Sequence, residues 1–131
     1  MTKIVVITHG CFAKTLVQVA EEILEKDSDF LTICFDLKME QDELQSKINE
    51  TLAPLVDSHS IIILTDLFGG TPSNLTIPLV QKEKIEVITG LNLAMLIYLM
   101  TQSPDTDFET LCNGTKVAGK EAIVVAGEFL P

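Results

Sequence analysis

Two uninterrupted aliphatic runs constrain the fold of this chain more than any other feature. They are Ile4–Ile7 (IVVI) and Ile61–Leu64 (IIIL). A strand with one solvated face alternates apolar and polar residues, whereas a strand inside a parallel sheet is covered on both faces and is apolar throughout. Both runs therefore predict central strands of a parallel sheet with helices on each side.

The rest of the chain alternates strand-like and helix-like patterns. The other strand-like runs are Leu31–Phe35, Ile85–Ile88 and Ala122–Val125. Apolar residues recur at helical spacing in Phe12–Leu24, Leu44–Leu55 and Phe108–Cys112. Such alternation is typical of an α/β domain. We predict a single domain over residues 1–131, a three-layer sandwich around a mostly parallel sheet in the common order 2-1-3-4.

Two of the expected helices have unusual features. Leu91–Met100 is apolar on most sides, so this helix is either deeply buried or at an interface, and we favour a dimer interface. Asn92 is expected to cap it. Pro78 falls inside the helix expected from Pro72 onward, and it lacks the N–H that would bond to the Asn74 carbonyl. We expect that helix to be kinked or shortened.

The charge balance and the cysteines exclude several classes of protein. The net charge is -10 and all 9 basic residues are lysines, so no basic face for nucleic acid can be assembled and anionic membranes are disfavoured. The 3 cysteines show no C-x-x-C spacing, which argues against a zinc site or a disulfide framework. No signal peptide or membrane-spanning stretch is found. We expect a cytoplasmic protein with reduced thiols and without metal or cofactor.

The two aliphatic runs end in the same way. Each is followed by a threonine and then by an ionisable residue, which is His9 after the first run and Asp66 after the second. In the order 2-1-3-4 these strands are neighbours, and the loops after them diverge at the crevice where such folds bind ligands. We therefore expect His9 and Asp66 to face each other. A carboxylate that accepts one imidazole N–H, in a bond of about 1.5–3 kcal/mol, leaves the other nitrogen free as a base or nucleophile.

A simpler interpretation of both residues is helix capping. Aspartate is a preferred N-cap, and either residue alone fits a cap as well as it fits chemistry. The glycine turn that follows Asp66 favours the site interpretation. Gly69 and Gly70 permit positive φ and close backbone approach, and we expect Thr71 and Pro72 to be the N-cap and first residue of a helix.

The Gly69–Ser73 turn is predicted to bind an anion. Free backbone amides and the helix dipole favour negative charge there by roughly 0.3–1 kcal/mol, or up to ~2 kcal/mol when partly buried. The hydroxyls of Thr71 and Ser73 are expected to add donors, and Gly10 begins a second helix beside the histidine. The chain has no arginine for a bidentate clamp, which suits a site that holds a phosphoryl group briefly. We infer that a partner supplies the cations and that Lys14 faces solvent.

The chain carries a set of motifs in a characteristic order. They are THG at Thr8–Gly10, DLFGGTPSN at Asp66–Asn74, GLNLAMLIYLM at Gly90–Met100 and GKEAIVV at Gly119–Val125. Together they resemble the enzyme IIA domain of the mannose-type (mannose/fructose/sorbose) bacterial phosphoenolpyruvate:sugar phosphotransferase system, and the likeness covers nearly the whole chain. The D-x-[FW]-G-G-[ST]-P block is the specific part, whereas the histidine motif by itself is not.

The resemblance implies a phosphoryl carrier. Such domains accept a phosphoryl group from the histidine phosphocarrier HPr and pass it to the cognate IIB component, which phosphorylates sugar entering through the membrane subunits IIC and IID. His9 matches the phosphoacceptor, Asp66 the orienting carboxylate, and Gly69–Ser73 the phosphate-contacting loop. Members are typically homodimers that exchange a C-terminal strand, so Ala122–Val125 is expected to be an antiparallel edge strand. A cytoplasmic protein, or one peripheral to the membrane permease complex, is implied, and the chain looks like a stand-alone IIA.

Other functions stay open from the sequence. A flavodoxin-like module would bind a small molecule in the same crevice, although the first loop, HGCFAKT, is poor in the hydroxyls and glycines of flavin sites. A response-regulator receiver needs a carboxylate pair where His9 stands and a lysine that AIVVAGEF does not provide. A regulatory relative that carries phosphate only as a signal fits the same residues. The transported sugar cannot be read from the sequence, because the resemblance implies a domain that never touches it.

Overall fold

A computed structural model describes the whole chain, residues 1–131. Its 4-stranded parallel sheet has the order β2-β1-β3-β4. The strands are β1 (Thr2–His9), β2 (Leu31–Phe35), β3 (Ser60–Thr65) and β4 (Ile85–Ile88). The helices are α1 (Phe12–Leu24), α2 (Gln41–Leu52), α3 (Thr71–Thr76), α4 (Leu93–Thr101) and α5 (Phe108–Glu121), with short 3-10 turns η1 (Ile77–Leu79) and η2 (Ala126–Phe129). The predicted α/β class and strand order are confirmed.

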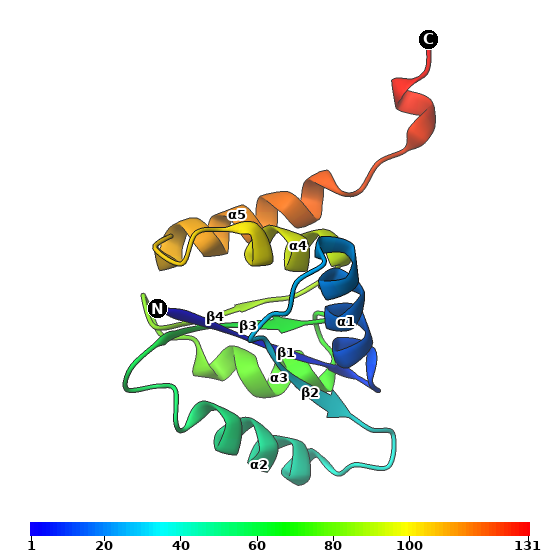
Figure 1. Cartoon of the computed structure of the whole chain (residues 1–131). Helices are drawn as coiled ribbons and strands as arrows, with labels where there is room; N and C mark the ends of the chain where they lie inside the picture. The colour runs from blue at the N-terminus through cyan, green and yellow to red at the C-terminus, as the bar shows by residue number, and fades with distance from the viewer.

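The sheet is the middle layer of three (Figure 1). Helices α1, α4 and α5 cover one face, and α2 and α3 cover the other. Alternate residues of β1 and β3 enter separate cores, with Ile4, Val6, Ile62 and Leu64 in one and Val5, Ile7, Ile61 and Ile63 in the other. Side chains of a strand alternate between its faces with a period of two. The uniformly apolar runs therefore fill both cores at once, as predicted.

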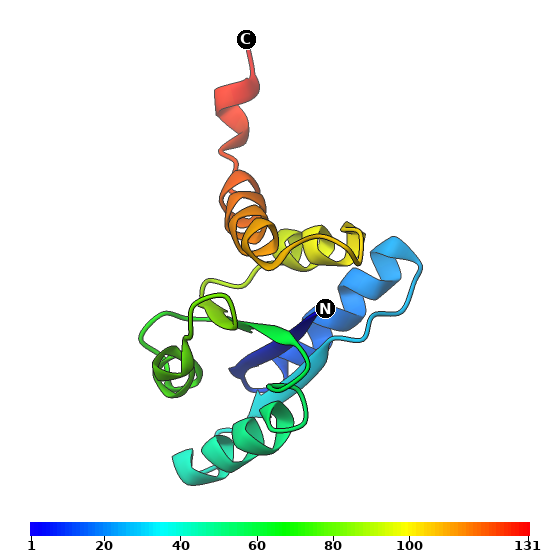
Figure 2. The ribbon, with the colours of Figure 1, turned by 90° about the vertical axis from the view of Figure 1, so that its left-hand side faces the viewer.

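Helix α4 is largely buried within its own chain. Met95, Leu96, Leu99 and Met100 belong to the core, and none of the apolar residues of α4 is exposed. Helix α5 lies across it (Figure 2). The single chain thus supports the deeply buried alternative, and a dimer interface at the half-buried residues of this segment stays a prediction. The Asn92 cap is confirmed, since its side-chain oxygen accepts the Met95 N–H at 3.1 Å.

Pro78 shortens α3, as predicted. The helix ends at Thr76 after 6 residues, and the chain continues in the 3-10 turn η1. A 3-10 turn does not use the hydrogen bond to the residue four positions earlier, which Pro78 cannot donate. Thr76 Oγ1 also donates to the Pro72 carbonyl at 2.8 Å within this short helix. No helix of the chain combines the length and apolarity that a membrane span requires.

The segment after α5 differs from the prediction. Ala122–Val125 forms no strand in this chain, and it leads into a C-terminal tail that projects from the body (Figures 1 and 2). The tail leaves α5 pointing away from the sheet, and it forms no bridge with β4 in its own chain. The expected antiparallel edge strand is therefore absent from the single chain. Exchange of this segment between two chains stays a prediction.

Shortening Leu96 tests the assignment of α4 to the core. Leu96 is 0% exposed, and Leu96→Ala should lower the free energy of unfolding by about 2–5 kcal/mol because it leaves a cavity. Urea unfolding followed by circular dichroism measures the change. The matched control is Ile23→Ala on α1, where the side chain is 54% exposed, and it should change stability by less than about 0.5 kcal/mol. Equal losses in the two variants would contradict the assignment.

Candidate active site

The candidate site forms where β1 and β3 end side by side. The two strands are parallel neighbours, so His9 at the end of β1 and Asp66 after β3 emerge at the same edge of the sheet. The threonine before the histidine fixes the local backbone. Thr8 Oγ1 is buried and accepts the Ala13 N–H of α1 at 2.7 Å. The start of α1 is thereby tied to the end of β1.

His9 and Asp66 face each other, as predicted. His9 Nδ1 lies 3.0 Å from Asp66 Oδ2 and 3.2 Å from Oδ1. Asp66 Oδ2 also accepts the His9 backbone N–H at 3.1 Å, so one carboxylate holds both the ring and the backbone of the histidine. The Asp66 side chain is 16% exposed, whereas the His9 side chain is 41% exposed. The orienting group is therefore mostly buried, while the imidazole reaches solvent.

This contact sets the imidazole tautomer. An ionised carboxylate only accepts hydrogen bonds, so the Nδ1–H donates and the lone pair of Nε2 is free. When Nε2 forms a bond to an electrophile the ring becomes positive, and the carboxylate stabilises that charge. The capping interpretation is wrong for both residues, because the N-cap positions of α1 and α3 are Cys11 and Gly70.

The two glycines of the turn have different roles. Gly69 has a φ of 89°, in the left-handed region that L side chains rarely adopt. Gly70 has an ordinary φ of -78°, but a Cβ there would lie 2.6 Å from His9 Cε1 and 3.3 Å from Nε2. The predicted positive φ is thus confirmed for Gly69. The predicted close backbone approach is confirmed for Gly70, which packs against the His9 ring. Helix α3 begins at Thr71, one residue earlier than expected, so Gly70 and not Thr71 is the N-cap.

Ser73 builds the turn instead of presenting its hydroxyl. The side chain is fully buried, and Ser73 Oγ donates to the Leu67 carbonyl at 2.6 Å. A hydroxyl has one proton, so the expected donation from Ser73 Oγ to a phosphate is wrong. Thr65 Oγ1 lies 2.7 Å from Ser73 Oγ and donates to it, which links the end of β3 to α3. Thr71 is half-buried and stays outside this network.

Phe35 belongs to the site, although sequence reasoning did not identify it. The centroid of its ring lies 6.0 Å from that of the His9 imidazole, with a tilt of 56°. It ends β2 directly opposite His9 in the parallel register. The sequence feature that could have identified Phe35 was its position at the carboxyl end of a strand adjacent to β1. Asp36, the next residue, makes a local turn, because its Oδ1 accepts the Lys38 N–H at 3.2 Å.

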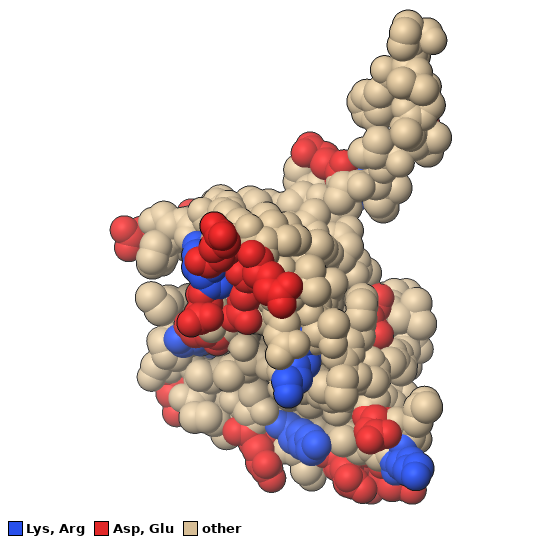
Figure 3. Space-filling view, turned by 45° about the vertical axis from the view of Figure 1, so that its right-hand side comes forward, with Lys and Arg blue, Asp and Glu red and all other residues tan.

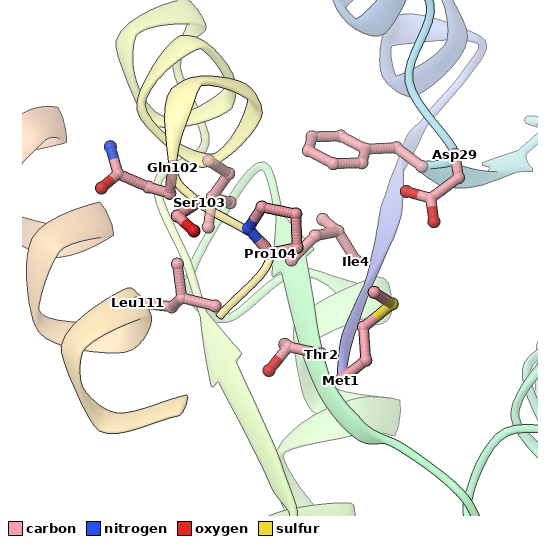
Figure 4. A pocket seen from close by; sticks show the side chains of 10 residues that line it. Met1, Thr2, Ile4, Asp29, Gln102, Ser103, Pro104 and Leu111 are labelled. Carbon is pink, nitrogen blue, oxygen red and sulfur yellow. The ribbon is translucent and has the colours of Figure 1, made fainter. Parts of the chain in front are cut away.

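The clearest pockets lie away from the histidine. One of about 180 Å³ opens at the amino-terminal edge of the sheet, between Ile4 on β1 and the turn that contains Pro104 (Figure 4). Its charged lining residue, Asp29, pairs with Lys3 at 2.9 Å. A second, of about 490 Å³, lies between β4 and α5. No three potential metal ligands gather anywhere in the chain. His9 lines neither pocket, and its side chain is open to solvent.

Comparisons of sequence relate the chain to bacterial phosphotransferase system (PTS) proteins. A family model described as the PTS system fructose IIA component matches residues 3–115. The PTS system mannose-specific EIIAB component of Escherichia coli K12 is 34% identical over 122 residues, which are 92% of this chain and 38% of that protein. The PTS system fructose-specific EIIA component of Bacillus subtilis is 23% identical over 131 residues, 99% of this chain and 90% of that protein. The chain thus spans well under half of the Escherichia coli relative.

A solved structure agrees with the fold. The phosphotransferase system component EIIA from Streptococcus agalactiae superposes with a TM-score of 0.85 at 26% identity, covering 98% of this chain and 99% of that one. The agreement extends over the strands and helices that carry the site.

Substituting each glycine of the turn separately tests how the imidazole is held. Gly70→Ala should push the ring away, break the Nδ1 contact with Asp66, and shift the neutral imidazole toward the Nε2–H tautomer. Long-range ¹H–¹⁵N NMR of the histidines measures this, with His59 as an internal reference. Gly69→Ala is the matched control, since a Cβ there meets nothing within 4 Å. It should cost about 1–2 kcal/mol of stability through its φ and leave the tautomer unchanged. An unchanged tautomer in Gly70→Ala would contradict the proposed fit.

Proposed function

Because this chain belongs to the IIA family of the mannose-type sugar phosphotransferase system, we propose that His9 accepts a phosphoryl group from HPr and passes it to a cognate IIB component during sugar uptake. The observation that carries the proposal is the geometry of His9. Its Nδ1 is held 3.0 Å from Asp66 Oδ2, while Nε2 is free on a ring with 41% of its side chain exposed. A nucleophile that must meet two protein partners in turn needs this combination of fixed orientation and access.

In the proposed step the Nε2 lone pair of His9 attacks the phosphorus. A new N–P bond forms while the bond between phosphorus and the donor histidine breaks, and the proton on Nδ1 stays in place. Asp66 remains ionised, and its contact with the Nδ1–H offsets the positive charge that the ring acquires. Transfer to IIB runs the same exchange with His9 as the leaving group. The carboxylate therefore stabilises the phosphorylated ring without becoming a phosphoacceptor itself.

We place the phosphate oxygens against Gly69 and Thr71. The Thr71 N–H opens α3 and has no acceptor within the helix, and the Thr71 hydroxyl adds a second donor. The Gly70 N–H already donates to the Leu67 carbonyl at 3.1 Å, so Gly70 contributes room beside Nε2 rather than a hydrogen bond. Ser73 contributes by holding the turn together. Few hydrogen bonds would therefore hold the phosphate oxygens, which suits a phosphoryl group that is passed on to a second protein.

A protein partner would dock on the carboxyl edge of the sheet. The exposed apolar side chains there come from the loops or helix starts that follow β1, β2 and β3, namely Phe12, Leu37, Leu67 and Phe68. Leu37 is 98% exposed and Phe68 is 74% exposed. Large apolar side chains concentrated around one polar site favour a protein surface as the donor over a free small molecule. Lys14 is exposed, and with no arginine in the chain the partner is proposed to bring the cationic groups.

We propose a homodimer in which each tail pairs with β4 of the other chain. The free edge of β4 borders two hollows against α5, one lined by Glu86 and Cys112 and the other by Ile88 and Gly119. An unpaired edge is a template for a further strand. The tail offers exposed apolar residues, Ile123, Val124, Val125, Phe129 and Leu130. Its face in Figure 3 shows no charged side chain, and Glu128 is its one charged side chain. Membrane subunits IIC and IID are proposed to be reached only through IIB.

Phosphorylation assays with purified components test the carrier role. With phosphoenolpyruvate, enzyme I and HPr, the protein should gain one acid-labile, base-stable phosphate on His9, found by peptide mass spectrometry. Asp66→Asn should slow the transfer by at least about 100-fold, because the ring loses its fixed tautomer. His59→Ala should keep the wild-type rate. Phosphate on a residue other than His9 would overturn the proposal, and an unchanged rate in Asp66→Asn would remove the role of the carboxylate.

Deletion of residues 122–131 tests the strand exchange. The truncated chain should be a folded monomer, because the tail makes no contribution to either core. Sedimentation velocity reports the mass and circular dichroism reports the fold. The full chain should sediment as a dimer at the same concentration. A truncated protein that still forms a dimer would exclude the tail as the dimerising element.

A further inference from the structure

Two cysteines come together beside the site histidine. Cys34 is on β2, and Cys11 is the N-cap of α1. Gly10, at a φ of 56°, turns the chain after β1 and forms an antiparallel bridge with Phe35. The Gly10 N–H donates to the Phe35 carbonyl at 2.7 Å. Cys11 follows Gly10 and Cys34 precedes Phe35, so this bridge brings the segments that carry the two cysteines together.

The two thiols are near enough for Cys11 to affect the ionisation of Cys34. Burial, followed by the Cys11 thiol, raises the pKa of Cys34, while the backbone N–H and ammonium of Lys14 lower it. Cys11 is exposed, whereas Cys34 is half-buried. Cys11 is therefore the more accessible of the two thiols to a dissolved oxidant. A disulfide needs Cα atoms roughly 4.4–6.8 Å apart, and the Gly10–Phe35 bridge draws together the chain segments that carry Cys11 and Cys34.

We infer that Cys11 and Cys34 are a redox-active pair that closes to an intrachain disulfide in the presence of a hydroperoxide. The Cys11 thiolate attacks the peroxide oxygen, the O–O bond breaks, and the products are a sulfenic acid and, with hydrogen peroxide, water. Cys34 sulfur then attacks Cys11 sulfur, the S–O bond breaks, and the hydroxide leaves with the Cys34 proton as a second water. The two thiols lose two electrons and the peroxide gains them. A thiol reductant reverses the reaction by exchange.

The disulfide ties the turn after His9 to β2 and so alters the chemistry of the histidine, a consequence that rests on the proposed function. Cys11 is two residues from His9, and its neighbour Phe12 is on the proposed docking surface. A displacement of a reacting atom by about 1 Å can cost on the order of 100-fold in rate. We expect the oxidised protein to accept phosphate at least about tenfold more slowly than the reduced protein.

Treatment of the full-length protein with hydrogen peroxide tests both parts. Non-reducing peptide mapping should show Cys11 joined to Cys34, and the intact mass should fall by that of two hydrogen atoms and recover with a reductant. Cys11→Ser and Cys34→Ser should each prevent this loss. Cys112→Ser should leave it intact, because burial, together with nearby Glu86, raises the pKa of the Cys112 thiol to about 11 and keeps it unreactive.

The outcomes separate the disulfide from its effect. A sulfenic acid or higher oxide on Cys11 without a link to Cys34, or a link between two chains, in protein that keeps its circular dichroism spectrum, would overturn the pairing. A disulfide that leaves the rate of His9 phosphorylation unchanged would overturn the effect on the histidine. Reduced protein that accepts no phosphate would instead count against the carrier role. The mass measurement would still show whether the disulfide forms.

Discussion

Parallel pairing of β1 with β3 is the constraint on which the rest of the structure depends. Both strands are buried on their two faces, so they supply one core with α1, α4 and α5 and another with α2 and α3. Because the strands run in the same direction, their carboxyl ends meet at one edge. Parallel pairing alone therefore places the residues that follow the two strands next to each other. The sheet thus stabilises the domain and sets the position of the site.

The residues at this edge of the sheet fix the position of His9. Thr8 and Thr65, at the ends of the two strands, each bond to the start of the next helix, one on each side of the sheet. His9 and Asp66 follow them and bond to each other instead of capping helices. Gly70 then packs so closely that a Cβ there would collide with the ring unless the ring moved. A histidine held by its backbone, its Nδ1 and its ring edge keeps one nitrogen available, which is what phosphoryl transfer requires.

Several expectations failed or stay open for one physical reason, namely that a sequence pattern does not say which surfaces meet. Leu91–Met100 is apolar enough for an interface, but α5 covers it. Ser73 has the right residue type for a phosphate donor, but its hydroxyl proton goes to the Leu67 carbonyl. Ala122–Val125 has the composition of a strand, but α5 directs it away from the sheet. Phe35 and the Cys11–Cys34 pair could be placed near His9 only through the register of β2 against β1 and the turn at Gly10.

The sequence by itself determined the α/β class, the two central strands, the facing of His9 and Asp66, the glycine turn and the shortening of α3 at Pro78. These follow from local rules, because apolar periodicity, the direction of parallel strands and the missing N–H of proline act over a few residues or one strand pair. The tertiary structure decided which hydroxyls are free, which apolar helix is covered, and which aromatic ring and thiols adjoin the histidine. Such contacts depend on how helices pack across the sheet, and that packing is a property of side chains distant in the chain.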